Sequence, residues 1–178
     1  MKKRVLILHG WGGSDAPHWQ SYLSGEIAKN YGCVSFLKFS GVENPQKGIW
    51  LEELKQELQE FKPTIVVCHS IANTLWFHAC QEKGIKKLQK LFLVAPPSFK
   101  CDIKELSSFF PCEIPAELHA KESLLITSTN DPYMSQSEAI NLQQKLNIPI
   151  KIIENGGHIN TQSGFGEWNW IVKEIEKI

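Results

Sequence analysis

Arginine is almost absent from this chain of 178 residues, because Arg4 is its only arginine. Bidentate recognition of phosphates and base edges normally draws on arginine side chains. Basic and acidic residues are also equal in number, at 19 each, so no net field attracts a polyanion or an anionic lipid. Neither a nucleic-acid partner nor a membrane partner is therefore expected.

The chain also lacks an apolar run long enough to span a membrane. The run that follows Arg4 is shorter than a secretion signal and leads directly into a histidine and glycines. The five cysteines are an odd number without a CxxC pair, which favours reduced thiols over disulfides or a zinc site. We expect a cytoplasmic protein with a single domain, residues 1–178.

What the chain does contain is a regular alternation of apolar, strand-like runs with helical patterns. The apolar runs are continuous, which is typical of parallel strands that are covered on both faces. The pattern predicts an α/β fold, a three-layer α/β/α sandwich with about six mostly parallel strands. The predicted strands are 4–9, 33–39, 64–69, 90–95, 123–128 and 150–153, and the predicted helices are 18–31, 49–61, 70–84, 135–146 and 166–178.

Two glycines, Gly32 and Gly84, are predicted to end the first and third helices. The segment 96–121 is irregular, with four prolines and a short helix expected near 103–110. The pattern leaves open whether this segment gates a site or binds a partner.

Three residues that suit acyl-transfer chemistry follow three different predicted strands. Ser70, Asp131 and His158 occur in the chain order of the triad of α/β-hydrolases. Ligands of open α/β sheets bind beyond the carboxyl ends of the strands, so these side chains are expected to meet there. Asp131 is expected to orient the His158 ring and to stabilise its imidazolium.

The stretch around the serine, "TIVVCHSIAN", departs from the G-x-S-x-G pattern of a nucleophile elbow. Cys68 and Ala72 occupy the two glycine positions, and both are small enough to fit the crowded turn. The alternative is that Ser70 simply caps the helix that follows a strand.

The loop "HGWGGS" after the first strand is expected to supply one amide of an oxyanion hole. We assign the two donors to the backbone N–H groups of Trp11 and Ile71. A dinucleotide or phosphate loop is the other interpretation, but Asp15 occupies the third glycine position and no GK[ST] sequence follows.

No metal and no other cofactor is expected. A metal site formed by His9, Asp15 and His18 is the alternative, but these residues fit a role in loop architecture better. The histidines other than His158 are predicted to be structural, with His69 packing below Ser70.

Four stretches together resemble one known family: "HGWGGSDAPHWQSYL", "CHSIAN", "TSTNDPYMSQSEA" and "GGHINTQSGFGEWNW". Between residues 5 and 171 the chain resembles the small serine hydrolases of the retinoblastoma-binding protein nine family, also called YdeN-like. The resemblance implies a lidless α/β-hydrolase fold with Ser70 as nucleophile, Asp131 as acid and His158 as base. The element L-x-C-x-E has only an incomplete match at residues 78–82, so binding to a retinoblastoma-type pocket protein is not expected.

These observations predict a serine hydrolase of the carboxylesterase type. It would cleave small esters, or amides, through an acyl-enzyme, with a small-molecule acyl substrate as its partner. Trp11, Phe99 and Tyr133 are candidates for the substrate pocket. The alternative function is a protein- or ligand-binding module that keeps the fold with little turnover.

Overall fold

A single sheet of six parallel strands forms the centre of the computed structural model, which describes residues 3–29, 32–82 and 84–178. The strand order is β2-β1-β3-β4-β5-β6. The predicted α/β sandwich is therefore confirmed, and all neighbouring strands are parallel. The strands are β1 (Arg4–Leu8), β2 (Cys33–Leu37), β3 (Ile65–His69), β4 (Leu88–Val94), β5 (Ala120–Ser128) and β6 (Ile150–Ile153).

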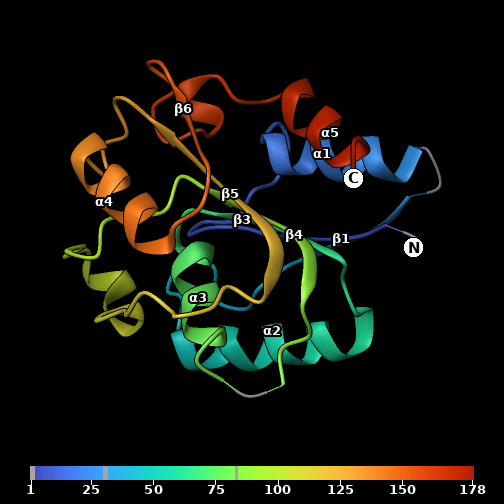
Figure 1. Cartoon of the computed structure of the whole chain (residues 1–178), viewed down its shortest axis with the longest axis horizontal. Helices are drawn as coiled ribbons and strands as arrows, with labels where there is room; N and C mark the ends of the chain where they lie inside the picture. Colours follow the sequence, from blue (N-terminus) through green and yellow to red (C-terminus); the bar gives the residue numbers. More distant parts are fainter. Residues whose placement is uncertain (1–2, 30–31, 83) are drawn as a thin grey trace.

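Helices cover both faces of this sheet, which gives three layers (Figure 1). The helices α1 (Trp19–Lys29) and α5 (Asn169–Glu176) lie on one face. The helices α2 (Lys47–Phe61), α3 (Ile71–Ala79) and α4 (Gln136–Leu146) contribute to the core on the other face.

Successive residues of β1 point alternately into the two cores. Val5 and Ile7 belong to the core below α1 and α5, whereas Leu6 and Leu8 belong to the core with α2 and α3. Because both faces of the strand are buried, every position favours an apolar residue. This burial explains why the sequence shows continuous apolar runs.

The first helix ends as predicted at a glycine. The Gly32 N–H donates to the carbonyl of Ile27 at 3.0 Å, and a Cβ at Gly32 would lie only 2.4 Å from that oxygen. Only glycine fits this close approach. The predicted helical residues 30 and 31 lie outside the described residues.

The third helix is shorter than predicted, because α3 ends at Ala79 rather than at Gly84. Beyond Ala79, Gln81 N donates to the carbonyl of His78, and Glu82 N donates to that of Ala79. These bonds span three residues and form tight turns, not a continued α-helix. Residue 83 lies outside the described residues.

The last helix also begins later than predicted, at Asn169. The residues before it form turns that bring Trp168 against Trp19, with ring centroids 5.1 Å apart. The start of α5 is thus determined by tertiary packing of an indole ring.

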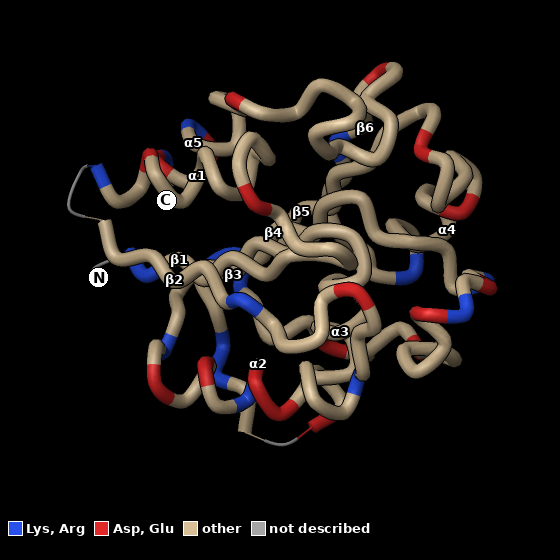
Figure 2. Tube along the Cα trace, turned by 180° about the vertical axis from the view of Figure 1, so that it is seen from behind, with Lys and Arg blue, Asp and Glu red and all other residues tan. Residues whose placement is uncertain are grey.

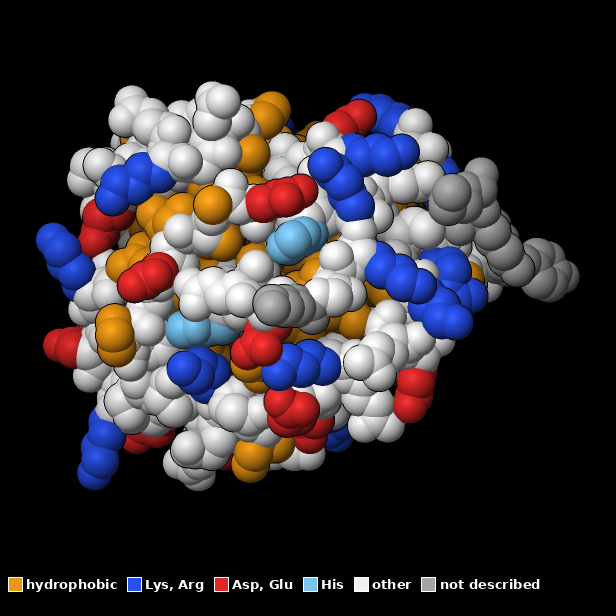
Figure 3. Space-filling model, turned by 60° about the horizontal axis from the view of Figure 1, so that its bottom comes forward, with side chains coloured by type: hydrophobic (Ala, Val, Ile, Leu, Met, Phe, Trp, Pro, Cys, Tyr) orange, Lys and Arg blue, Asp and Glu red, His pale blue; other side chains and the backbone are white. Residues whose placement is uncertain are grey.

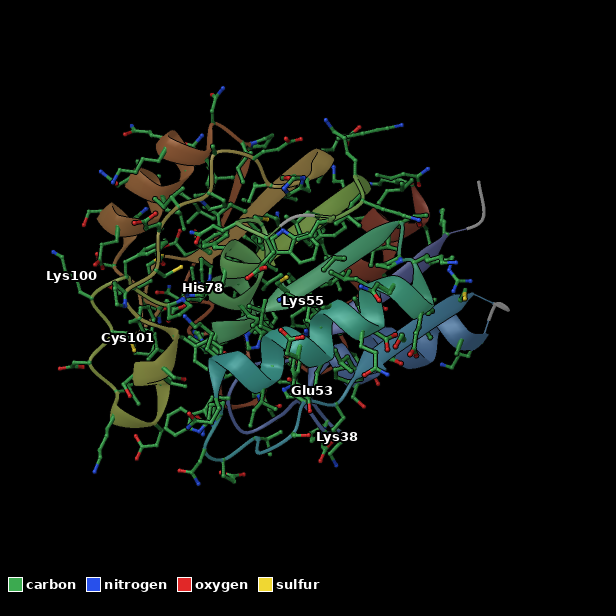
Figure 4. All side chains as sticks on the ribbon, turned by 90° about the horizontal axis from the view of Figure 1, so that it is seen from below. Lys38, Glu53, Lys55, His78, Lys100 and Cys101 are labelled. Carbon is green, nitrogen blue, oxygen red and sulfur yellow. The ribbon has the colours of Figure 1, made fainter. Side chains whose placement is uncertain are left out.

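The longest connection, residues 95–119, joins β4 to β5 and contains the 3₁₀ helix η1 (Lys104–Phe109), as the predicted short helix required. Lys100 extends away from the molecule on this connection, and Cys101 follows it closer to η1 (Figure 4). Leu106 and Phe109 of η1 are buried, so the connection is packed onto the body of the protein.

Charged positions lie mainly on the helices and loops outside the sheet (Figure 2). On the face that Figure 3 presents, basic and acidic side chains are interspersed, and several basic ones group near the amino terminus. Among the described residues, no helix combines the length and apolar character that crossing a membrane requires.

Candidate active site

The site lies where β1 and β3 adjoin at the centre of the sheet. The chain leaves β1 toward β2 on one side and returns to β3 on the other side, which makes this position a topological switch point. Gly10 follows β1 and Ser70 follows β3, and the two residues approach closely. A Cβ at Gly10 would lie 2.7 Å from the Ser70 Cβ, so the loop after β1 needs glycine here.

Ser70 occupies a strained backbone conformation, with φ 55° and ψ −129°. Its side chain makes no capping hydrogen bond to α3, so the alternative of a simple helix cap is wrong. A non-glycine residue in such a sparsely populated region costs of order 1–3 kcal/mol and requires support from its surroundings. The serine therefore stands on a sharp strand-to-helix turn.

Several hydrogen bonds hold this turn in place. The Ser70 N–H donates to the Val94 carbonyl at 3.0 Å. The buried Asn73 side chain donates to the carbonyls of Ser70 and Val94, at 2.7 and 2.8 Å. Cys68 and Ala72 are fully buried beside the turn, as their small size permits. Asn73 thus ties the turn to β4, a role that the sequence did not indicate.

The structure brings Ser70, His158 and Asp131 into one hydrogen-bonded chain. The His158 Nδ1 lies 2.9 and 3.0 Å from the two Asp131 carboxylate oxygens, and its Nε2 lies 2.9 Å from Ser70 Oγ. A carboxylate only accepts, so Nδ1 carries the proton and Nε2 is left to accept from the Ser70 hydroxyl. The Asp131 and His158 side chains are 3% and 8% exposed, so little water competes for these bonds.

Asn130 joins the loop that carries Asp131 to the loop that carries His158. Its side-chain oxygen accepts from the Gly157 N–H at 2.7 Å and from the Ser128 hydroxyl at 2.8 Å. Gly157 has φ 53°, and a Cβ there would lie 2.6 Å from the Ser163 Cβ. Asn130 is a second residue that sequence reasoning missed, because only the fold shows that the two loops adjoin.

The amides expected to form an oxyanion hole are both free of protein acceptors within the part of the chain that is described. Ile71 is the first residue of α3, where an N–H has no acceptor within the helix. Trp11 lies on the loop after β1, which bonds from Gly12 N to Val42 O and from Gly13 N to Gly10 O keep folded. Both amides are therefore available to a ligand at Ser70.

A cavity of about 300 Å³ opens beside Ser70 and His158. Trp11 and Tyr133, which were expected in the substrate pocket, line it and are 38% and 44% exposed. Tyr133 lies edge-on to the His158 ring, with centroids 4.6 Å apart.

Phe99 does not line this cavity, so its prediction as a substrate-pocket residue is wrong. Its ring stacks on Phe77 of α3, with centroids 6.1 Å apart, and it faces a separate cavity of about 700 Å³ beside α4. The connection after β4 turns so that Pro97 and Cys101 face Ser70 instead. Loop direction of this kind depends on tertiary packing.

Three further histidines lie buried near the site and are neutral. Burial lowers the pKa of His9, and burial with the nearby His158 and His9 lowers the pKa of His18 to about 4. The pKa of His69 is held well below its usual range by burial and then by His158 and His18. His69 Nε2 lies 3.1 Å from the His158 carbonyl, so it supports that loop from below.

A metal site at these residues has no support in the geometry. His9 Nε2 accepts from the Phe39 N–H and its Nδ1 donates to the Gly10 carbonyl, so neither nitrogen is free to bind a metal. Within the described ranges, no group of three or more His, Cys, Asp or Glu residues is placed to hold a metal ion.

A family model described as serine hydrolase matches residues 5–177. This chain belongs to the serine hydrolase family. The family resemblance stated from the four sequence stretches is therefore confirmed, and the protein is a hydrolase. A comparison with curated proteins gives no match.

Solved structures show how far the fold of this serine hydrolase is shared. The ydeN gene product of B. subtilis has a TM-score of 0.88 and 20% identity, over 99% of this chain and 98% of that one. A structure described as a YdeN-like hydrolase, from Pectobacterium atrosepticum, has a TM-score of 0.78 and 23% identity, over 99% and 90%. Est1E from Butyrivibrio proteoclasticus, solved with ferulic acid bound, has a TM-score of 0.71 and 11% identity, over 98% and 87%. At such identities the likeness shows a common fold.

Proposed function

We propose that this serine hydrolase cleaves small, uncharged carboxylic esters or amides through an acyl-enzyme on Ser70. The observation that carries the proposal is the hydrogen-bonded chain from Asp131 through His158 to Ser70 Oγ, with distances of 2.9–3.0 Å at each link. A nucleophile, a base and an orienting acid in such contact are what acyl transfer by serine requires.

In the first half of the reaction, His158 Nε2 takes the Ser70 hydroxyl proton as Oγ attacks the substrate carbonyl carbon. The carbonyl oxygen becomes an oxyanion, which accepts hydrogen bonds from the amides of Trp11 and Ile71. The tetrahedral intermediate then collapses, and His158 gives its proton to the leaving oxygen or nitrogen. The products are the acyl-enzyme and the free alcohol or amine.

In the second half, a water molecule replaces the leaving group. His158 takes a proton from this water as its oxygen attacks the acyl carbon, and the same two amides bind the second oxyanion. Collapse of this intermediate breaks the bond to Ser70 Oγ, and His158 returns the proton to the serine. The carboxylic acid leaves, and the enzyme is restored.

The surrounding electrostatics favour this cycle. Asp131 faces the His158 Nδ1 and stabilises the imidazolium that forms in each half-reaction. His18 and His69 have lowered pKa values and are neutral near pH 7, so they do not oppose that positive charge.

The cavity supports small and uncharged substrates in particular. Its volume of about 300 Å³ is at the lower end of the range for small-molecule sites. No Lys, Arg, Asp or Glu occurs among the described residues that line it, so a charged group would lose its hydration there without gaining a partner. Est1E, which shares the fold and was solved with a carboxylic acid bound, gives general support to carboxylic esters.

The test is covalent labelling by a fluorophosphonate, combined with hydrolysis of p-nitrophenyl acetate and butyrate. Wild type is expected to be labelled and to hydrolyse both esters, and Ser70→Ala is expected to lose both properties. Ser107→Ala, which changes an exposed serine on η1, is the matched control and should behave as wild type. Equal labelling of wild type and Ser70→Ala would show that Ser70 is not the nucleophile. Labelling without turnover of any ester would instead favour a binding module.

A further inference from the structure

The cavity beside Ser70 has two unlike walls. One wall is polar and consists of His18, which precedes α1, together with Asn160, Thr161 and Gln162. The facing residues from the connection after β4 are less polar: Pro97, Cys101, Ile103 and Leu106. Figure 4 shows Cys101 on that connection near η1. A ligand that fills the cavity therefore meets hydrogen-bonding groups on one side and mainly apolar atoms on the other.

His18 is the buried member of the polar wall, and its hydrogen bonds determine its tautomer. Its Nδ1 lies 3.1 Å from the Gln20 N–H and accepts from it, so the single proton of the neutral ring is on Nε2. No described residue accepts a hydrogen bond from that Nε2–H. The side chain is 6% exposed and lines the cavity, and its lowered pKa of about 4 keeps it neutral. The cavity thus contains a hydrogen-bond donor without a protein partner.

The chemistry of the proposed reaction indicates which half of the substrate faces this wall. His158 must reach the leaving oxygen to protonate it, so the leaving group lies on the His158 side of the carbonyl carbon. The polar residues 160–162 follow His158 directly in the chain. His18 lies on the same side, because its ring is 5.0 Å from the His69 ring, which is itself 5.2 Å from the His158 ring.

We propose that the leaving group of the substrate is an uncharged polar alcohol that accepts a hydrogen bond from His18 Nε2 and lies against residues 160–162. The acyl group is a short apolar chain that lies against Pro97, Ile103 and Leu106. This assignment rests on the proposed ester hydrolysis at Ser70 and adds the substrate class and a specificity-determining residue to it. A neutral hydrogen bond discriminates between substrates with and without an acceptor by about threefold to tenfold.

The test uses two pairs of esters of equal length. In the first pair, 2-ethoxyethyl butyrate is compared with pentyl butyrate, so that an ether oxygen replaces a methylene in the leaving group. In the second pair, pentyl methoxyacetate is compared with pentyl butyrate, so that the oxygen lies in the acyl group. Each kcat/KM is divided by the rate constant for alkaline hydrolysis of the same ester, which removes differences in intrinsic reactivity.

Wild type is expected to favour the leaving-group oxygen by about threefold to tenfold and to gain nothing from the acyl oxygen. In His18→Phe, which keeps a ring but has no donor, the leaving-group preference should fall to about one. His18→Gln, which retains N–H donors, should restore part of it. Thr161→Val serves as a second variant, because Thr161 is exposed and the change preserves shape, and it should reduce the preference without loss of folding.

A preference that is unchanged in His18→Phe, or that follows the acyl oxygen, would overturn the assignment while leaving ester hydrolysis at Ser70 intact. Absence of turnover with all three esters in wild type would overturn the proposed function itself, and the assignment with it. Fluorophosphonate labelling and a thermal melt of each variant separate a local effect from misfolding.

Discussion

Replacement of Gly10 by alanine is expected to damage catalysis through one steric contact. The added Cβ would lie 2.7 Å from the Ser70 Cβ and 3.2 Å from its Oγ. Carbon atoms pack at about 3.5–4.0 Å, so the loop after β1 and the turn at Ser70 must separate by roughly 1 Å. The φ of Gly10 is not positive, so alanine meets no backbone strain and the contact alone is tested.

Two effects of that displacement set its size. A misplacement of about 1 Å at the reacting groups costs roughly 10²-fold in rate. Trp11, the next residue, carries one of the two proposed oxyanion donors, and loss of one donor costs about 10²–10³-fold. Since both effects arise from the same shift, we expect kcat/KM to fall by about 10²–10³-fold in total.

The assay is hydrolysis of p-nitrophenyl butyrate, with the rate of fluorophosphonate labelling as a second measure of Ser70 reactivity. Gly25→Ala is the matched control, because its Cβ would meet no atom within 4 Å on α1. That variant should keep full activity and gain up to about 1 kcal/mol of stability. A Gly10→Ala enzyme that is folded and within twofold of wild type would refute the close-approach reasoning.

Three further changes test the surroundings of the site. Asn73→Ala removes two buried hydrogen bonds and should lower the free energy of unfolding in urea by about 2–4 kcal/mol, whereas exposed Asn141→Ala should leave it unchanged. Cys68→Gly should leave kcat within twofold while costing about 1–2 kcal/mol of stability, and a tenfold loss of kcat would show that the thiol itself supports the turn. The unfolded chain protonates His18 near pH 6.5 and the folded chain only near pH 4, so acidification through this window favours unfolding by about 3 kcal/mol. Urea unfolding at pH 7 and pH 4.5 should therefore show a smaller acid-induced loss in His18→Phe than in wild type, and equal losses would contradict the buried neutral state.

Much of the fold follows from local patterns. The six apolar runs became the six strands because residues such as Val5 and Leu6 enter opposite cores and must both be apolar. Element ends were less predictable, since they depend on contacts with distant residues. The start of α5 at Asn169 follows from the packing of Trp168 on Trp19, which no local propensity reports.

The residues around Ser70 show the same division. Their order in the chain and their positions after strands indicated that Ser70, Asp131 and His158 should meet, and the structure places them in hydrogen-bond contact. The supporting residues Asn73 and Asn130 could not be predicted, because each joins segments that are brought together only by folding.

The sequence by itself therefore determined the α/β class, the order of the strands' loops and the candidate residues Ser70, Asp131 and His158. These features depend on periodicity and on residue type, which are properties of the chain. Only the tertiary structure decided that Phe99 turns away from the cavity and that the His18 Nε2–H remains without a protein acceptor beside Ser70. Loop direction and hydrogen-bond pairing depend on which distant segments pack together, and a linear pattern does not contain that information.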